Sequence, residues 1–183
     1  GEVIQHEKHN MWRVFESQKD AAHVANGKVR IESYRAGKPY FLITYDGENT
    51  YDLNGKQEKS AADKRWASNF GYGVIRHAFD EGYRLEKVGV DTVNNEVTHQ
   101  IKIIDPQGGE TLFDITQKDY KIVRVGFDTP RDWHERIYSN FFTKEEYNWF
   151  QAGKVELFYK GKKANDIIWT DFKVNESLAD SLF

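Results

Sequence analysis

The stretch that decides the fold is PYFLITYDGENTYDLNGK, residues 39–56. Large apolar residues come first, followed by Asp46-Gly47, further aromatic residues and Asn54-Gly55. Asp-Gly and Asn-Gly between strand-forming residues are typical of β-hairpins, because tight turns between twisted strands need residues that tolerate a positive φ. The stretch therefore predicts strands that fold back on one another as antiparallel sheet.

Other segments alternate apolar and polar residues, as strands with one buried face do. In KVRIESY (28–34), Val29 and Ile31 share one face, and Arg30 and Glu32 share the other. The same alternation occurs in THQIKII (98–104), ETLFDIT (110–116), YKIVRVGF (120–127) and IIWTDFKV (167–174). Turn residues separate these segments, including Pro106 to Gly109, Asp128 to Pro130 and Lys160-Gly161. The pattern predicts a mainly β fold built as one long antiparallel sheet.

One segment, residues 60–82, departs from the strand pattern. Ser60 and Asp63 resemble a helix N-terminal cap, and Gly82 is a typical stop. Between them an apolar stripe recurs near helical spacing, formed by Trp66, Phe70, Val74, Ile75, Ala78 and Phe79. Gly71 and Gly73 weaken the middle by up to ~1 kcal/mol each. The segment predicts a bent amphipathic helix, or two short ones, that covers the sheet as a lid.

Composition narrows the class of protein. The 183 residues suit one domain, and the net charge of −3 argues against nucleic-acid binding. The absence of cysteine excludes disulfides and thiolate sites. No apolar run reaches the ~20 residues of a membrane span. No signal peptide is visible at the start, as expected of a mature or trimmed chain.

The ordered set of motifs resembles the LolA-like superfamily of periplasmic lipoprotein-sorting and lipid carrier proteins. The motifs are KVRIE (28–32), YDGENTYDLNG (45–55) and VNESLADSLF (174–183), and the resemblance covers residues 28–183. It implies an unclosed antiparallel β-barrel, or half-barrel, with a helical lid over an apolar cavity. It also implies one lipid-binding domain over residues 1–183, with the family's leading helix absent or truncated.

The resemblance further implies a carrier in the periplasm or bacterial envelope, without catalytic residues, cofactor or metal. Its partners would be a lipid or acylated lipoprotein, with possible envelope partner proteins. Arg30 matches the family's strand arginine and is the candidate lid anchor.

The candidate ligand-binding residues follow from the two apolar patterns. The lid's inner face is predicted to comprise Trp66, Phe70, Val74, Ile75 and Phe79. The cavity wall is predicted to comprise Val29, Ile31, Phe41, Ile43, Ile101, Ile103, Phe113 and Ile115. The alternative is that these residues form an ordinary packed core.

Two other functions stay open. A protein-interaction module could dock a partner through an exposed sheet edge or the aromatic residues Phe141, Phe142, Trp149 and Phe150, and the resemblance also implies envelope sensing as an alternative. A hydrolase acting on glycans or lipids would need two carboxylates about 5–10 Å apart in a cleft. Asp132 and His134 are interpreted as a surface pair, and His6 and His9 as part of a solvated terminus, not as metal ligands.

Overall fold

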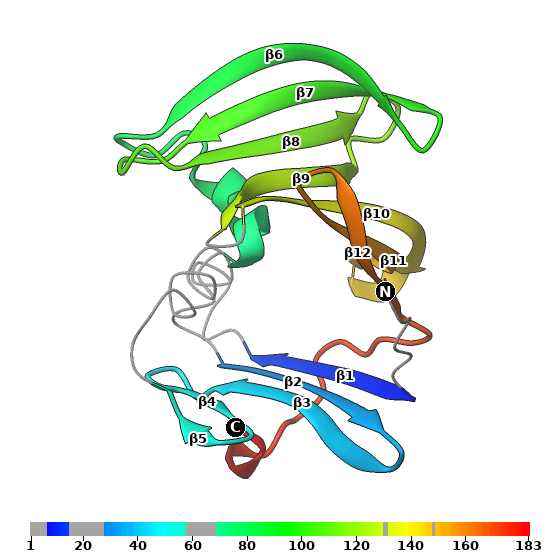
Figure 1. The fold of residues 1–183 in the computed structure, drawn as a ribbon. Helices are drawn as coiled ribbons and strands as arrows, with labels where there is room; N and C mark the ends of the chain where they lie inside the picture. Colours follow the sequence, from blue (N-terminus) through cyan, green and yellow to red (C-terminus); the bar gives the residue numbers. More distant parts are fainter. Residues whose placement is uncertain (1–6, 15–27, 58–68, 130–131, 148) are drawn as a thin grey trace. The chain divides into compact units, whose positions relative to one another are not determined.

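A computed structural model describes the chain at residues 7–14, 28–57, 69–129, 132–147 and 149–183. The chain divides into two compact units. Unit 1 comprises Gly1–Gly73 and Ser177–Phe183, and unit 2 comprises Val74–Glu176. Each unit carries one antiparallel sheet (Figure 1). The predicted mainly β, antiparallel fold is confirmed, but the prediction of one long sheet is wrong.

Unit 1 holds a five-stranded sheet in which neighbours in sequence are neighbours in space. Its strands are β1 (Lys8–Val14), β2 (Lys28–Arg35), β3 (Lys38–Tyr45), β4 (Thr50–Asp52) and β5 (Gly55–Lys56). The hairpins predicted from residues 39–56 are confirmed, with Gly47 and Gly55 at φ +104° and +107°. The first strand, β1, was not predicted. It pairs with β2 along its whole length.

The two faces of the unit 1 sheet differ in character. Val29 and Tyr45 form the buried centre of one face, and Met11, Ile31 and Ile43 pack against them. The other face carries Arg30, Glu32 and Thr44, as strand alternation requires. Residues near the C-terminus contact this polar face of the unit 1 sheet. Lys28 Nζ lies 2.8 Å from Asp180 Oδ1, in the short 3-10 helix η5 (Asp180–Leu182).

Unit 2 holds a seven-stranded sheet, which Figure 1 shows as a strongly curved surface. Its strands again follow one another in sequence order. They are β6 (Arg84–Val93), β7 (Glu96–Ile104), β8 (Glu110–Thr116), β9 (Ile122–Thr129), β10 (Asp132–Lys144), β11 (Trp149–Tyr159) and β12 (Lys162–Ile168). The short 3-10 helix η4 (Glu145–Tyr147) separates β10 from β11. The last strand ends at Ile168, so the predicted continuation to Val174 is wrong.

Turn chemistry sets the hairpins of unit 2. Asn94 and Asn95, between β6 and β7, have φ values of +51° and +65°. Lys160 and Gly161, between β11 and β12, have φ values of +51° and +69°. Positive φ at both central residues is the signature of the type I′ turn, whose twist matches that of the strands it joins. These turns fix the strand register, and the register decides which side chains share a face.

In the described part of the chain, neither sheet closes on itself. The first sheet ends at β1 and β5, and the second ends at β12 and β6. The predicted unclosed character is therefore confirmed. None of the helical segments within the described residues is long and apolar enough to cross a membrane.

The predicted amphipathic lid helix is wrong where the structure describes it. Residues 58–68, including Trp66, lie outside the described residues. The described part is a 3-10 helix, η3 (Asn69–His77), and no α-helix occurs among the described residues. Gly71 and Gly73 disfavour an α-helix, which explains why the apolar spacing alone misled the prediction. Phe79, predicted to face inward, is 93% exposed.

Candidate functional site

The apolar face of unit 2 carries an open hollow of about 490 Å³. Three strands and one turn contribute its lining. The lining residues are Leu85, Lys87, His99, Ile101, Ile115 and Tyr120. Its volume lies in the range of about 300–1,000 Å³ that is common for small-molecule sites.

Strand register brings these side chains together. Lys87 lies opposite Ile101, and His99 lies opposite Ile115. Residues that face one another across an antiparallel pair point to the same side of the sheet, and alternate residues along a strand do so too. Leu85 is two residues from Lys87 on β6, so it joins the same face. The hollow is therefore a direct product of the β6–β7–β8 pairing.

A β-bulge in β6 extends the apolar face beyond the hollow. The register shifts between Lys87 and Gly89, so that Val90 lies opposite His99. The extra residue resets the alternation, as bulges do. Leu85 and Val90 are 45% and 62% exposed, and Val97 on the neighbouring strand is 50% exposed. Aliphatic side chains thus stay accessible along this edge.

Tyr120 reaches the hollow from the β8–β9 turn. Its φ of +55° is unusual for a residue with a bulky side chain. Thr116 holds the turn in place, because its Oγ1 donates to Asp119 Oδ1 at 2.5 Å and accepts from Lys121 N at 2.9 Å. Thr116 is only 1% exposed, so these bonds are sheltered from water. Tyr120 itself is 73% exposed.

The predicted wall residues divide between the two units. Ile101, Ile103, Phe113 and Ile115 share the apolar face of unit 2, as the register of β7 and β8 places them. Ile101 and Ile115 line the hollow, whereas Ile103 and Phe113 are fully buried beside it.

The other four predicted wall residues lie in unit 1. Val29 is fully buried, Ile31 and Ile43 pack beside it, and Phe41 is 40% exposed. The packed-core alternative therefore describes Val29, Ile103 and Phe113. Among the predicted lid residues, Val74 and Ile75 are half-buried in η3, and the side chain of Phe70 lies outside the described residues. Of the predicted lid residues whose side chains the structure describes, Val74, Ile75 and Phe79 do not line the hollow.

Four lining residues were missed by the sequence analysis: Leu85, Lys87, His99 and Tyr120. A signal for His99 exists, because it precedes Ile101 and Ile103 in the same alternation. Leu85 and Lys87 alternate in the same way, but the bulge at Val88 breaks the pattern that would link them to Val90. Tyr120 owes its position to the turn geometry, which the strand pattern does not encode.

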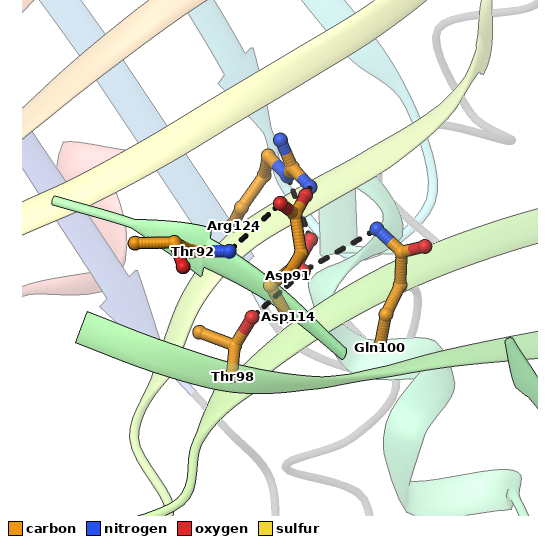
Figure 2. Close-up of polar contacts among 6 residues, drawn as sticks. All are labelled: Asp91, Thr92, Thr98, Gln100, Asp114 and Arg124. Atoms are coloured by element: carbon orange, nitrogen blue, oxygen red, sulfur yellow. Dashed lines mark hydrogen bonds and ion pairs between the residues drawn. The ribbon is translucent and has the colours of Figure 1, made fainter. Parts of the chain in front are cut away.

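The opposite face of the same strands carries a polar network (Figure 2). Asp114, which is fully buried, accepts from Arg124 Nε at 2.6 Å, from Thr98 Oγ1 at 3.1 Å and from Gln100 Nε2 at 3.4 Å. Arg124 also pairs with Asp91. Burial lowers the pKa of Arg124, but the two carboxylates outweigh that effect and raise it. The pKa of Asp91 is lowered by the Thr92 N–H and then by Arg124. The pairing of these charges gives this face a structural role.

Other sequence candidates also find structural partners. Arg30, the candidate lid anchor, donates to Glu32 Oε2 at 2.9 Å and to the Leu182 carbonyl oxygen at 3.2 Å. That Arg30 anchors a lid stays a prediction, because residues 58–68 lie outside the residues that the structure describes. His9 Nδ1 lies 2.6 Å from Ser33 Oγ, while His6 lies outside the described residues. Within the described ranges no three His, Asp or Glu side chains gather as a metal site would require.

The interpretation of Asp132 and His134 as a surface pair is wrong. His134 is 2% exposed and stacks on Tyr159 with ring centroids 4.4 Å apart. Its Nδ1 donates to the Phe158 carbonyl oxygen at 2.9 Å, and Asp132 pairs with Lys160 at 2.6 Å. The alternation of strand β10 points His134 into the apolar face, beside Phe127. His134 and Asp132 thus each bind a different partner, the Phe158 carbonyl oxygen and Lys160.

Comparisons with known proteins give two similar solved structures. One, from Vibrio parahaemolyticus, is described as an outer membrane lipoprotein-sorting protein domain. It is 12% identical, with a TM-score of 0.41 over 87% of this chain and 71% of that one. The other is a LolA superfamily protein from Nitrosomonas europaea. It is 8% identical, with a TM-score of 0.41 over 90% of this chain and 85% of that one. No protein-family model and no curated protein matches the sequence.

Proposed function

We propose that the chain is a binding or carrier protein for an apolar ligand, such as a lipid or a lipoprotein acyl chain. The ligand lies on the apolar face of unit 2, in the hollow formed by β6, β7 and β8. The protein acts in the periplasm or bacterial envelope and binds its ligand without catalysing a reaction. Residues 1–183 serve as one lipid-binding domain, since the motifs that resemble the LolA-like superfamily extend from residue 28 to residue 183 and so fall in both units.

The proposal rests on one observation. Aliphatic side chains line an open hollow on the apolar face of unit 2, and the side chains of β6, β7 and β8 leave that hollow unfilled. Leu85, Ile101 and Ile115 supply the apolar lining. The same three strands pair their charges on the opposite face, where Lys102 Nζ lies 3.2 Å from Glu110 and 3.9 Å from Glu86. Exposed aliphatic surface costs free energy in water, so an accessible apolar face is a common sign of a binding surface.

The energetics suit a carrier. Each methylene of a lipid chain gains about 0.8 kcal/mol when it leaves water. A membrane offers the chain a similar gain, so a protein that exchanges lipids with membranes needs an apolar surface and few specific polar contacts. Among the described residues, the lining of the hollow includes no carboxylate, so they offer the hydrolase alternative no acid pair at this site.

The test is extraction of the purified protein followed by mass spectrometry of co-purified lipid. Titration of the delipidated protein with a fluorescent fatty acid follows. Leu85→Asp places a charge in the hollow, and we expect it to abolish co-purified lipid and weaken binding of the probe more than tenfold. Ile168→Asp is the matched control, because Ile168 is 69% exposed on β12, the other edge strand of the same sheet.

Equal binding by the two variants would overturn the placement of the ligand. A careful extraction that yields no lipid, together with no binding of the fatty acid, would overturn the function itself. Circular dichroism of both variants checks that the sheet is intact.

A second candidate function, docking of a protein partner, is favoured by exposed aromatic side chains near η4. Tyr147, Trp149 and Phe150 are 47%, 39% and 43% exposed. Phe150 makes an edge-to-face contact with Phe141, with ring centroids 5.9 Å apart, so the two rings pack together on neighbouring strands. A photo-crosslinking residue in place of Trp149 would trap such a partner in cells, while Leu85→Asp would leave the crosslink unchanged.

A further inference from the structure

The hollow combines its apolar lining with three polar side chains: Lys87, His99 and Tyr120. Within the part of the chain that the structure describes, none of the three has a hydrogen-bond or ion-pair partner. Lys87 and Tyr120 are exposed and His99 is half-buried, so their polar atoms are accessible from the hollow. Their functional groups can donate hydrogen bonds, and the Lys87 ammonium is a full positive charge.

The unpaired lysine in the hollow contrasts with its neighbours on the same strands. Lys102, one residue beyond Ile101 on β7, has two carboxylate partners on the other face. Arg124 on β9 likewise has two, Asp91 and Asp114. Lys102 and Arg124 are thus neutralised on the polar face, whereas Lys87 has no ion-pair partner among the described residues and lies beside aliphatic side chains on the other face. The chain as a whole has a net charge of −3, so the positive charge in the hollow is a local feature.

Lys87 and His99 are also close to one another along the sheet. Lys87 lies opposite Ile101, and His99 is two residues from Ile101 on β7. Such diagonal neighbours are about 7–8 Å apart and within reach of long side chains. Leu85 and Ile115 flank them on β6 and β8. Val90 and Val97 continue the aliphatic surface along the edge and are half or more exposed.

We infer that the hollow binds a single-chain amphiphile with an acidic head, whose chain lies on Leu85, Ile101 and Ile115 and whose head pairs with Lys87 and His99. This inference rests on the proposed function and specifies its ligand. The head is a carboxylate or a phosphate, because both accept charge-assisted hydrogen bonds from an ammonium and from N–H and O–H donors. A hollow of about 490 Å³ suits one chain of this kind.

The test compares three probes with the same 14-carbon chain: tetradecanoate, tetradecyl phosphate and tetradecanol. Each competes with a bound fluorescent fatty acid on the full chain, at concentrations below micelle formation. We expect at least one acidic probe to bind about tenfold more tightly than the alcohol, a difference equivalent to about 1.4 kcal/mol. The acidic probe that binds more tightly identifies the head.

Three lysine variants attribute the preference to one side chain. Lys87→Gln is expected to reduce the preference for the acidic probe to less than about twofold while tetradecanol binds as before, and Lys87→Arg is expected to retain it. Lys118→Gln is the control, since Lys118 is an exposed lysine of the β8–β9 turn outside the lining and its replacement makes the same change in net charge.

Equal affinity for all three probes, or an unchanged preference in Lys87→Gln, would overturn the acidic head and leave the proposed function standing. Binding of no probe at all, with Leu85→Asp indistinguishable from the unmodified protein, would overturn both.

Discussion

Arg30 and Leu182 are 152 residues apart in sequence, and the Arg30 guanidinium donates to the Leu182 carbonyl oxygen at 3.2 Å. The same side chain pairs with Glu32 at 2.9 Å on its own strand. One guanidinium therefore links the C-terminal residues to the sheet of unit 1 and neutralises a carboxylate that is only 8% exposed.

Replacing this side chain tests its structural role. Arg30→Gln leaves Glu32 with less charge compensation and frees the C-terminal residues, so we expect unit 1 to lose about 1–3 kcal/mol of stability. Hydrogen exchange of the β2 amides measures the loss in unit 1, and the unit 2 amides serve as an internal reference. Arg35→Gln is the matched control, because Arg35 is an exposed end residue of the same strand. Equal exchange in both variants would contradict the prediction.

The pH dependence of unit 1 follows from Glu32. Burial raises its pKa, but hydrogen bonds from Asn10 and Arg30 and the charge of Arg30 together hold it below the ordinary value of 4.5. Since the unfolded chain binds the proton more readily, this contribution to stability is complete above about pH 4.5 and is lost as the pH falls through the lower, folded pKa.

We therefore expect the difference in free energy of unfolding between the unmodified protein and Glu32→Gln to shrink from pH 7 to pH 3. Urea denaturation along that range measures it. Glu48→Gln, at an exposed glutamate in the β3–β4 turn, makes the same change in net charge and is the control. A difference for Glu32→Gln that stays constant from pH 7 to pH 3 would refute the argument.

Asp114 organises the polar face of unit 2. Its carboxylate is fully buried and accepts from Arg124, Thr98 and Gln100. Asp114→Asn removes the charge that compensates Arg124 at this position, so we expect a loss of about 2–3 kcal/mol in the free energy of unfolding. Urea denaturation measures this loss, and Asp128→Asn, at an exposed position of β9, is the control. A loss no larger than that of the control would mean that Asp91 alone satisfies Arg124.

Alanine substitution at two strand glycines is expected to have opposite effects on stability. A methyl group on Gly153 would lie 2.3 Å from the Asn140 carbonyl oxygen, and Asn140 already has a positive φ of +53°. Gly153→Ala should therefore force backbone movement and cost about 1–3 kcal/mol. Gly89→Ala meets nothing within 4 Å, so it should be neutral or slightly stabilising. The melting temperatures of the two variants test this difference. A similar fall in both would show that the close approach of the Gly153 and Asn140 backbones is relaxed in solution.

Turn chemistry and alternation predict much of this fold because both are local. The hairpins of residues 39–56 and the turn at Lys160-Gly161 follow from residues that tolerate positive φ. The common face of Ile101 and Phe113 follows from alternation and is confirmed by the register of β7 and β8.

The features that the sequence did not predict depend on a bulge, a turn and a glycine-containing segment, none of which shows in the alternation of apolar and polar residues. The bulge at Val88 adds one residue to β6 and so aligns Val90 with Lys87 and Leu85. The position of Tyr120 depends on the hydrogen bonds of Thr116. The amphipathic pattern around Phe79 indicated an α-helix, but the glycines within it favour another geometry, and Phe79 is exposed.

The division of the chain has a consequence for its synthesis on the ribosome. Unit 2 is one continuous segment, whereas unit 1 needs residues 177–183 to join strands made long before. The seven-stranded meander can therefore fold while translation continues, but the Arg30 guanidinium meets its carbonyl partner only after residues 177–183 emerge. Until then Arg30 and Lys28 lack these partners, and the polar face of the early strands stays uncovered there.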